Sequence, residues 1–551
     1  MSPTVRLKPD ATGRTNPRPE RKVIKMRTRP ILHVMIGSLL LVPTVARGQD
    51  SPKCTAMTRF QAPGVALEIT KAQSVPAGAA PQGRGGRGGA AINLPAYCRV
   101  DGIIDRRLGT DGKPYGIGFA VTLPDNWNGR FLFQGGGGLN GTVALPLGAQ
   151  AAGGTPGLAR GFAVVSTDTG HQSSGGAFDG SFMRDQQASL DFAYVAVGRV
   201  AVIAKQVVAQ YYGRPADRSY FAGCSTGGRE AMLMTERYPT YFDGVVAGAP
   251  AMRTGFSGLG DRWVAATLNQ IAPKDAAGKP IPEQVFSASD KKLIVDTILN
   301  VCDAKDGVKD GMIFNIRGCA DFDPVATLTC KGAKTDACLT AQQTAALKKA
   351  FAGPRDSRGN QIYPGFLYDT GITASGGGIP GLLSPGPGPL GPPNLSTELD
   401  VDKEALTLAR DPRAVGDTKW WTNLNAFSAR GGKLLFYHGA SDPWFSALDT
   451  LDYYEKMSAD NGGMDKVAAW SRFFLVPGMG HCGGGQATDT FDMLSAVVDW
   501  VEKGTAPDSV TATGTAFPGR TRPLCAYPNH AQYAGSGNSE EAKNFVCRNH
   551  E

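Results

Sequence analysis

The sequence predicts an α/β fold in which a parallel sheet lies between helices. Three observations support this class. Short apolar strands alternate with a long helical segment between residues 117 and 222, a tight glycine turn then joins a strand to a helix, and strand patterns return after residue 432. Such alternation is typical of parallel sheets, because the chain must cross over the sheet between two parallel strands.

The first half of the chain contains most of the predicted elements. Residues 49–97 show only loose patterning, whereas strand patterns occur at 117–123, 130–134 and 162–168. Residues 187–212 predict a helix, because apolar residues recur at alternating steps of four and three and so share one face. These residues are Leu190, Tyr194, Val197, Ala201, Ala204, Val208 and Tyr211.

A nucleophile motif follows this helix. A short strand at 218–222 leads into Gly223-Cys224-Ser225-Thr226-Gly227, and a helix pattern begins near Arg229. The G-x-S-x-G turn between a strand and a helix is the nucleophile elbow of α/β-hydrolases. The sharp turn presents the Ser225 hydroxyl, and the amino end of the helix points its unpaired N–H groups at the developing oxyanion.

An irregular segment then interrupts the pattern at residues 251–425. It mixes short helices, cysteine loops and a Gly/Pro tract at 376–393 that cannot form regular structure. Sheet patterns return at 433–438 and 472–476, followed by a helix near 491–501. Insertions at this point of the fold serve as lids over the serine. We predict an α/β-hydrolase domain in two parts, 49–250 and 426–551, with a large inserted lid domain at 251–425.

The charge distribution singles out residues 1–48 as a signal peptide and leader. They hold ten of the 57 Lys and Arg residues and two of the 49 acidic residues, which leaves 47 of each in the rest of the chain. This balance of charges does not indicate binding to nucleic acid or to an anionic membrane. An apolar run at 31–45, too short to span a bilayer, precedes the cleavage pattern Ala46-Arg47-Gly48. The start is Met1 or Met26, and an uncleaved anchor is the alternative.

Export has two further consequences. The Arg/Gly run at 83–89 predicts a flexible surface loop rather than an RNA-binding segment. The ten cysteines all follow the leader and predict disulfides, because exported chains meet an oxidising environment. Proximity favours Cys302–Cys319 and Cys330–Cys338, and the absence of C-x-x-C spacing speaks against a zinc site.

The base and the acid of a triad should follow the serine in the order acid, then histidine. His481 follows a core strand and the turn Pro477-Gly478-Met479-Gly480, which can present it to a cleft. Asp442 comes just after strand 433–438, where a carboxylate can orient the imidazole. We prefer it to Asp449 and Asp452 of the next helix, and interpret His438 as structural.

The oxyanion hole needs two N–H donors. One is Thr226, the residue after the nucleophile, and the other should come from the glycine loop at 135–138. The alternative for that loop is a flexible turn.

An acidic loop forms a second candidate site. Asp303, Asp306 and Asp310 lie within eight residues and alternate with glycines. Carboxylates and carbonyls suit a hard cation such as calcium, although the spacing is not that of an EF-hand. A solvated acidic turn is an equally good interpretation of the residues alone.

Four motifs together resemble the tannase and feruloyl esterase family, over nearly all of the mature chain. They are Gly223-Cys224-Ser225-Thr226-Gly227-Gly228-Arg229-Glu230, Tyr437-His438-Gly439-Ala440-Ser441-Asp442, Val476-Pro477-Gly478-Met479-Gly480-His481-Cys482 and Thr521-Arg522-Pro523-Leu524-Cys525. The resemblance implies a bridge between Cys224 and Cys482, which would join the nucleophile to the base. It also implies Cys54–Cys98 and Cys525–Cys547.

The resemblance assigns further roles by position. It implies the triad Ser225, Asp442 and His481, and Gly138 as the oxyanion glycine. It implies a structural Ca²⁺ held by Asp303, Asp306 and Asp310 and by the carbonyls of Val308 and Met312. Phe445 matches an aromatic position that contacts substrate. Trp444 and the pair Trp420-Trp421 are further candidates for contacts to the acyl group, and packing in the core is an equally good interpretation of each.

The resemblance implies a secreted or periplasmic serine carboxylic-ester hydrolase that acts through an acyl-enzyme on small esters of aromatic acids. Feruloyl or galloyl esters are favoured, because the Gly/Pro tract does not match relatives that hydrolyse mono(2-hydroxyethyl) terephthalate. Hydrolysis of that monoester is the alternative activity. Two alternatives from other functional classes are a non-catalytic binding protein and a zinc-dependent hydrolase. The sequence does not determine the oligomeric state.

Overall fold

The computed structural model describes residues 51–81, 92–374, 381–384 and 392–549. The predicted leader, the Arg/Gly run and most of the Gly/Pro tract lie outside these residues. Within them, the chain from residue 51 onward belongs to one compact unit.

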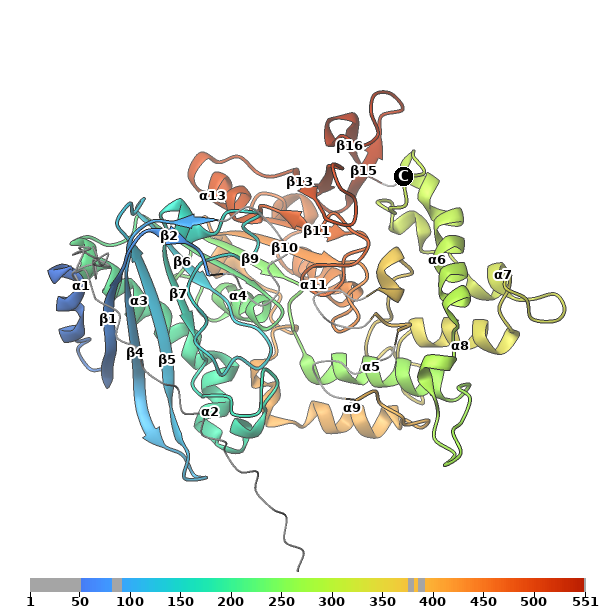
Figure 1. The fold of residues 1–551 in the computed structure, drawn as a ribbon, viewed down its shortest axis with the longest axis horizontal. Coiled ribbons are helices and arrows are strands. Elements are labelled where there is room, and N and C mark those ends of the chain that lie inside the picture. Colours follow the sequence, from blue (N-terminus) through green and yellow to red (C-terminus); the bar gives the residue numbers. More distant parts are fainter. Residues whose placement is uncertain (1–50, 82–91, 375–380, 385–391, 550–551) are drawn as a thin grey trace, which may run out of the picture. The chain divides into compact units, whose positions relative to one another are not determined.

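A mixed sheet forms the centre of the fold (Figure 1). From β7 through β6, β8, β9 and β10 to β11 all neighbouring strands are parallel, and β1, β4 and β5 extend one edge in antiparallel pairing. In sheet order the strands are β1 (Leu67–Val75), β4 (Tyr97–Leu108), β5 (Pro114–Pro124), β7 (Ala163–Thr167), β6 (Arg130–Gln134), β8 (Arg218–Cys224), β9 (Gly244–Gly248), β10 (Lys433–Gly439) and β11 (Ser471–Val476).

The predicted strands are all present in the central sheet, and three other strands of that sheet were missed. β1 lies in the stretch that showed only loose patterning, and β4 precedes the first predicted strand. Both belong to the antiparallel edge, where more buried and less buried residues alternate, whereas strands such as β7 and β9 are buried at every position. β9 has five residues, two of them glycine, so its sequence carries little strand signal.

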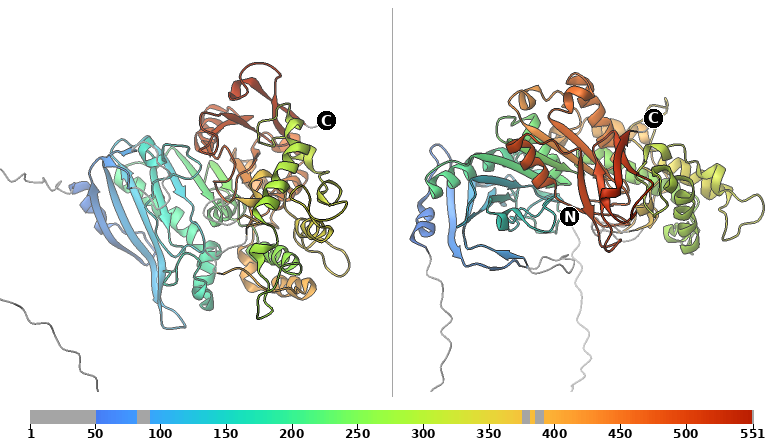
Figure 2. Two further views of the ribbon diagram at one scale, coloured as in Figure 1. Left: turned by 45° about the vertical axis from the view of Figure 1, so that its right-hand side comes forward. Right: turned by 90° about the horizontal axis from the view of Figure 1, so that it is seen from above.

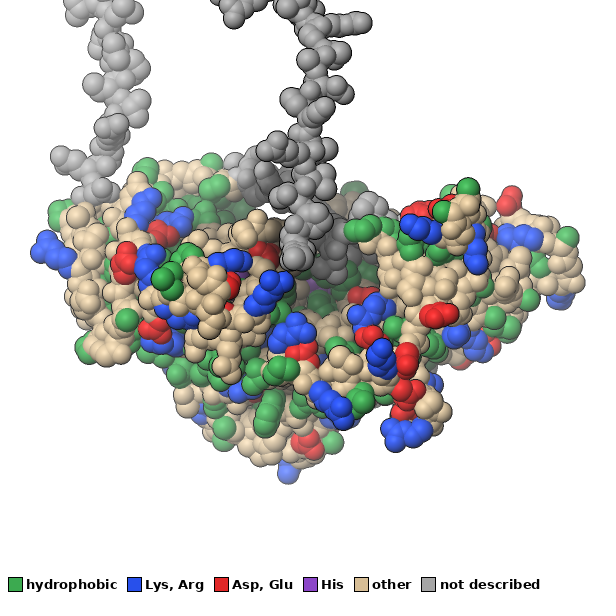
Figure 3. All heavy atoms as spheres, turned by 90° about the horizontal axis from the view of Figure 1, so that it is seen from below, with side chains coloured by type: hydrophobic (Ala, Val, Ile, Leu, Met, Phe, Trp, Pro, Cys, Tyr) green, Lys and Arg blue, Asp and Glu red, His purple; other side chains and the backbone are tan. Residues whose placement is uncertain are grey.

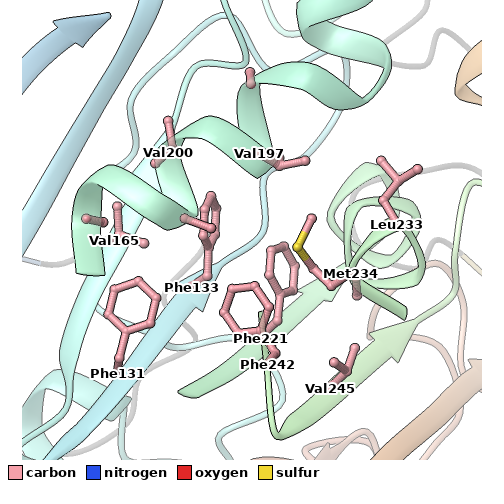
Figure 4. Packing of buried hydrophobic residues seen from close by; sticks show 14 of the residues in the cluster. Phe131, Phe133, Val165, Val197, Val200, Phe221, Leu233, Met234, Phe242 and Val245 are labelled. Carbon is pink, nitrogen blue, oxygen red and sulfur yellow. The ribbon is translucent and has the colours of Figure 1, made fainter. Parts of the chain in front are cut away.

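Successive residues of the central strands point to opposite faces of the sheet and build two separate cores. Phe131, Phe133, Phe221 and Val245 belong to one core, with Phe133 and Phe221 stacked at 4.8 Å (Figure 4). Their neighbours along the chain, Leu132, Tyr220 and Val246, belong to the other. Burial of each such side chain is favourable by about 1.5–3 kcal/mol, so both faces need a covering layer.

Helices supply these layers. The helical run Gln186–Tyr212, made of α2 (Gln186–Leu190), a π-helical turn (Asp191–Val195) and α3 (Ala196–Tyr212), packs on the first core, as does α4 (Thr226–Glu236). The run is long and apolar enough to cross a membrane, but Val197, Val200 and Val208 are buried in the protein. We therefore interpret it as a core helix. The opposite face is covered by α13 (Met493–Lys503).

The described residues between 251 and 425 form helices joined by loops (Figure 2). They contribute most of a third apolar cluster, to which Ala440 also belongs and against which Leu475 packs. The helices are α5 (Thr254–Asn269), α6 (Ala288–Cys302), α7 (Pro324–Leu328), α8 (Ala341–Phe351) and α9 (Val401–Ala409). Side chains at the amino ends of α6 and α8 fix where these helices start: Ser287 with Asp290, and Thr340 with Gln343, form reciprocal capping boxes. The domain boundaries 251 and 425, and the role of this segment as a lid, stay predictions.

The chain ends in two small sheets. The first comprises β12 (Thr490–Phe491), β13 (Ser509–Thr513) and β14 (Arg522–Cys525), and the second comprises β15 (Asn529–Tyr533) and β16 (Phe545–Asn549). Among the described residues, the other α-helices are α1 (Pro52–Ala56), α10 (Asn425–Ser428), α11 (Ala447–Asp460) and α12 (Met464–Val467), and β2 (Gly78–Ala79) pairs with β3 (Asn93–Leu94).

All ten cysteines are paired as expected. The bridges are Cys54–Cys98, Cys224–Cys482, Cys302–Cys319, Cys330–Cys338 and Cys525–Cys547. On the face drawn in Figure 3, acidic and basic side chains are interspersed and no single sign dominates. That mixture agrees with the balanced charge of the chain beyond its leader.

Candidate active site

The backbone at Ser225 has the geometry of a nucleophile elbow. Ser225 adopts φ 65° and ψ −125°, a strained conformation for a residue with a side chain. Its N–H donates to the Gly248 carbonyl at 3.0 Å, and its carbonyl accepts from Arg229 and Ala251 at 3.0 Å each. These three bonds hold the strained residue in place. A Cβ at Gly223 would lie 2.3 Å from the Gly227 carbonyl oxygen, which explains the glycines of the motif.

Asp442 orients His481. The carboxylate Oδ2 lies 2.7 Å from His481 Nδ1, and Oδ1 accepts the N–H groups of Trp444 at 2.9 Å and Phe445 at 3.1 Å. Burial alone would raise the pKa of Asp442, but the imidazoles of His481 and His438 outweigh it and hold the pKa below its ordinary value. The acid is therefore ionised at neutral pH and keeps the Nδ1–H tautomer of His481.

That tautomer leaves His481 Nε2 as a proton acceptor. The atom is buried and has no hydrogen-bond partner among the described residues. His481 and Ser225 line the same cavity. A general base needs an acceptor nitrogen in reach of the hydroxyl it deprotonates, and hydrogen bonds of this kind often tighten only when substrate is bound.

His438 is buried beside the same carboxylate. Its Nε2 lies 3.2 Å from Asp442 Oδ2 and 2.8 Å from the Phe445 carbonyl, and its Nδ1 lies 2.9 Å from Thr450 Oγ1. The ring is structural in the sense we expected, because it has a protein partner at each nitrogen. No sequence feature indicated that one of these partners would be Asp442.

Two main-chain N–H groups are available for an oxyanion. Among the described residues, no acceptor binds the N–H of Gly138 or of Thr226, the first residue of α4. The Thr226 hydroxyl donates to the Gly138 carbonyl, which ties the two donors together. Gly138 has φ 58°, and a Cβ there would lie 2.5 Å from the Ala177 carbonyl oxygen, so a glycine is required.

A carboxylate that sequence reasoning missed anchors this loop. Glu230 of α4 is fully buried, and it accepts from the Gly136 N–H at 2.8 Å and from Asn140 Nδ2 at 2.7 Å. Burial raises the pKa of Glu230 against the effect of these bonds. The Glu230 side chain thus bonds the glycine loop, and Asn140 just beyond it, to the helix that follows the nucleophile.

Glu230→Leu should lower kcat by about tenfold to a hundredfold with little change in KM, because a displaced loop moves an oxyanion donor. Glu230→Gln is the matched control and should stay within about tenfold of wild type. Its carboxamide can accept from Gly136 and donate to Asn140 Oδ1, an atom that has no hydrogen-bond partner among the described residues. Steady-state kinetics on both folded variants test this, and equal activity of the Leu variant and wild type would contradict it.

Ser225 and His481 open into a cavity of about 590 Å³. Its aromatic lining comes from Phe178, Tyr437, Trp444 and Phe491. The Trp444 ring lies 5.3 Å from the His481 ring and meets Phe178 edge to face at 5.4 Å. Trp444 is thus in the expected place, whereas Phe178 comes from an irregular loop and carried no recognisable sequence signal.

The other aromatic candidates lie elsewhere. The Phe445 ring packs 5.2 Å from His481, but Phe445 is not among the described residues that line the cavity. Trp420 and Trp421 are 59% and 56% exposed and also lie outside the lining. No described residue of 251–425 lines the cavity either.

The bridge Cys224–Cys482 joins the residue before Ser225 to the residue after His481. Its Cα atoms are 6.1 Å apart, although 258 positions separate the cysteines in sequence. Both cysteines line the cavity. The bridge therefore restrains the two segments that carry the nucleophile and the base.

The acidic loop lies in a different part of the chain and is bonded internally. Asp303 accepts N–H groups of Asp310 and Gly311 at 3.2 and 3.0 Å, and Asp306 accepts that of Phe314 at 2.9 Å. Asp310 pairs with the buried Arg522. Burial, with the nearby Asp310 and Asp303 carboxylates, raises the pKa of Asp306 to about 8. In the described part of the chain, no three acidic, histidine or cysteine side chains are gathered as a metal site.

Comparison with known proteins decides the family. A sequence profile described as tannase and feruloyl esterase matches residues 98–385 and 403–548. The chain belongs to the tannase and feruloyl esterase family. It is therefore a carboxylic ester hydrolase of this type.

Individual relatives agree with the family. Mono(2-hydroxyethyl) terephthalate hydrolase of Piscinibacter sakaiensis is 38% identical over 521 residues, covering 83% of this chain and 85% of its own. A probable feruloyl esterase B-2 of Neosartorya fischeri is 30% identical over 479 residues, covering 82% and 86%. The crystal structure of feruloyl esterase B from Aspergillus oryzae has a TM-score of 0.71 at 27% identity, covering 90% of this chain and 99% of its own. These relatives confirm the predicted α/β-hydrolase-type fold.

Proposed function

We propose that this member of the tannase and feruloyl esterase family is an exported serine esterase. It hydrolyses esters of aromatic acids of the feruloyl or galloyl type. The observation that carries the proposal is the 2.7 Å contact between Asp442 and His481, with the buried Nε2 of His481 left to accept a proton beside the Ser225 cavity. Ser225 is the nucleophile, His481 the general base and Asp442 the residue that orients the base.

Each group has one task in the reaction. His481 Nε2 takes the Ser225 proton as Oγ attacks the ester carbonyl, and the N–H groups of Gly138 and Thr226 bind the resulting oxyanion. The imidazolium then gives that proton to the leaving alcohol, and an acyl-enzyme forms. Water, deprotonated by the same nitrogen, attacks the acyl-enzyme, releases the acid and restores Ser225.

The residues of the cavity wall favour esters of aromatic acids as substrates. Trp444, Phe178, Tyr437 and Phe491 offer ring faces and edges on which a planar acyl group can pack, a contact worth about 0.5–1.5 kcal/mol beyond area burial. Phe445 would act indirectly, by packing against His481. Among the relatives, both the feruloyl esterases and the terephthalate monoester hydrolase are named for esters of aromatic acids.

A substrate panel tests this function. Methyl ferulate, methyl gallate, mono(2-hydroxyethyl) terephthalate and p-nitrophenyl acetate should be compared by kcat/KM, and methyl ferulate or methyl gallate should rank first. Highest kcat/KM on the terephthalate monoester would support the alternative activity. No turnover of any ester would support a non-catalytic binding protein, and loss of activity to chelators without loss to fluorophosphonates would support a zinc hydrolase.

Structural calcium is a second part of the proposal. Asp303, Asp306 and Asp310, with the carbonyls of Val308 and Met312, would supply the oxygen ligands that suit this hard cation. The mutual charge of the buried carboxylates favours a bound cation, while the pairing of Asp310 with Arg522 already compensates one of them. The ion would stiffen residues 303–312 and take no part in the chemistry.

Chelation should therefore lower the melting temperature more than it lowers kcat. An ion that binds only the folded state stabilises it by about 2.7 kcal/mol at a hundredfold excess over Kd. Asp306→Ala should abolish the response of Tm to added calcium, and Asp296→Ala, in an exposed i,i+4 ion pair on α6, should keep it. A wild-type Tm that changes with neither chelator nor added calcium would show that Arg522 and the loop N–H groups stabilise the acidic loop without a bound ion.

Export is the third part of the proposal. Five disulfides in the folded chain suit an oxidising compartment, and the sequence pattern of residues 1–48 suits a cleaved signal peptide. Mass determination of the protein recovered from periplasm and medium tests both cleavage and compartment.

A further inference from the structure

We infer that Asp369 is a positioning residue that fixes the loop of the catalytic acid against the loop of the catalytic base. These are the Asp442 loop (residues 440–446) and the His481 loop (residues 477–482), and Asp369 lies between α8 and α9. The inference rests on the proposed function, because it takes Asp442 and His481 as that acid and base.

Asp369 binds both loops through a single oxygen. Its Oδ2 accepts the Ser441 hydroxyl at 2.8 Å and the Gly478 N–H at 2.6 Å. Ser441 directly precedes Asp442, and Gly478 stands three residues before His481. Asp369 is fully buried, so water cannot replace either bond without entering the core. A shift of one loop against the other would therefore break one of the two bonds.

The main chains meet closely at the same point. The Ser441 hydroxyl oxygen accepts the Gly371 N–H at 3.0 Å, and the Ser441 N–H donates to the Met479 carbonyl at 3.0 Å. A Cβ at Gly371 would lie 2.4 Å from the Gly478 carbonyl oxygen and 2.7 Å from Ser441 Cβ. A glycine is required at this position, because any side chain would push the two loops apart.

The far end of the Asp442 loop is bonded to the same stretch of chain, residues 363–371, which we name the bracing segment. The Tyr363 hydroxyl oxygen accepts the Ser446 N–H at 3.0 Å, and the Ser446 hydroxyl donates to the Gly365 carbonyl. Ser446 is the last residue before α11. Both ends of the loop that carries Asp442 thus depend on the bracing segment, and buried networks of this kind hold their members rigidly.

The role of Asp369 needs an accepting oxygen more than it needs a charge. Burial raises the pKa of Asp369 against the effect of the bonds from Ser441 and Gly478. In either protonation state Oδ2 can accept both hydrogen bonds, and so can the carbonyl oxygen of an asparagine. A leucine has a similar size and no acceptor, so these two substitutions separate the hydrogen bonds from the packing.

Asp369→Leu should lower kcat on the best ester of the substrate panel by about tenfold to a hundredfold with little change in KM. The reason is that the cavity stays while the Asp442–His481 pair is displaced. Asp369→Asn should stay within about fivefold of wild type, because it keeps an acceptor for both loops. Wild-type kcat in folded Asp369→Leu, or an equal loss in both variants, would overturn the inference.

Asp290→Leu is the matched control for loss of a buried carboxylate. Asp290 is also buried, in the first turn of α6, and pairs with Lys334 at 2.7 Å. This variant should lower the melting temperature and leave kcat of the folded protein within about threefold. A fall in kcat as large as that of Asp369→Leu would show a general effect of destabilisation and overturn the positioning role.

Ser441→Ala gives an independent readout that does not require Asp369→Leu to fold. It removes the hydroxyl between Asp369 and the Asp442 loop and leaves the bond to Gly478, so kcat should fall by about threefold to tenfold. In the Asp369→Leu background the same change should cost less than about twofold more, because the hydroxyl has already lost its acceptor. Wild-type kcat in Ser441→Ala, or losses that simply multiply, would overturn the inference.

The outcomes separate this inference from the proposed function. If a fluorophosphonate labels Ser225 at equal rates in wild type and in folded Asp369→Leu, and their kcat values agree, only the positioning role is wrong. If wild type hydrolyses no ester of the panel, or the adduct forms on another residue, the proposed function is wrong as well.

Discussion

Ser225→Ala should reduce kcat on methyl ferulate by about a thousandfold or more, as removal of the nucleophile does in other serine triads. The fold should be retained, because the substitution removes one oxygen and leaves the strained backbone bonded to Gly248, Ala251 and Arg229. Initial rates and the melting temperature of the purified variant measure both effects.

Ser458→Ala provides the control. Ser458 is also buried, and its hydroxyl donates to the Tyr454 carbonyl within α11. We expect less than a tenfold change in kcat from it. Near wild-type turnover by Ser225→Ala would show that another residue is the nucleophile.

The double variant Cys224→Ala, Cys482→Ala should lose more activity than its loss of stability explains. Removing a native bridge from an exported protein costs about 2–5 kcal/mol in the free energy of unfolding. At a temperature where the variant is still folded, kcat should nevertheless fall, because general-base catalysis needs His481 within about 3 Å of Ser225. Activity measured against the fraction folded separates the two effects.

A second bridge gives the matched control. Cys330 and Cys338 close a loop with a sequence separation of eight, and neither lines the cavity. Replacing both by alanine should lower the melting temperature and leave kcat of the folded protein within a few fold. If both double variants keep wild-type kcat while folded, the Cys224–Cys482 bridge has no part in positioning. Non-reducing peptide mapping checks the pairing itself.

The sequence alone was sufficient for the features that depend on local pattern. The elbow at Ser225 was predictable because its glycines allow contacts that a Cβ would block. Asp442 was predictable because acids of this fold follow a strand end, and the structure places it against His481. The bridges Cys302–Cys319 and Cys330–Cys338 followed from short loops, whereas Cys224–Cys482 needed a family resemblance.

Features built from distant segments could not be predicted. Glu230 reads as an ordinary helical residue, and it becomes an anchor only when the fold brings Gly136 and Asn140 to it. Phe178 reaches the cavity from a loop without periodicity. The antiparallel edge was missed because the burial pattern of β1 is irregular and its partner, β4, lies more than twenty residues away.

Phe445 shows the limit of a role assigned from position in the sequence alone. It follows Asp442 by three residues, and its N–H does bind that carboxylate. The side chain packs against His481 and is not part of the described lining. Adjacency in sequence therefore located the residue near the base but did not determine which way its ring would face.

The most direct test of the central claim is to identify the residue that an active-site phosphonylating agent labels. The protein should be incubated with a fluorophosphonate, and the adduct should be located by peptide mass spectrometry while residual activity on methyl ferulate is followed. We expect one adduct per chain on the peptide that contains Ser225, formed in proportion to the activity lost. An adduct on another residue, or full activity without any adduct, would contradict the claim.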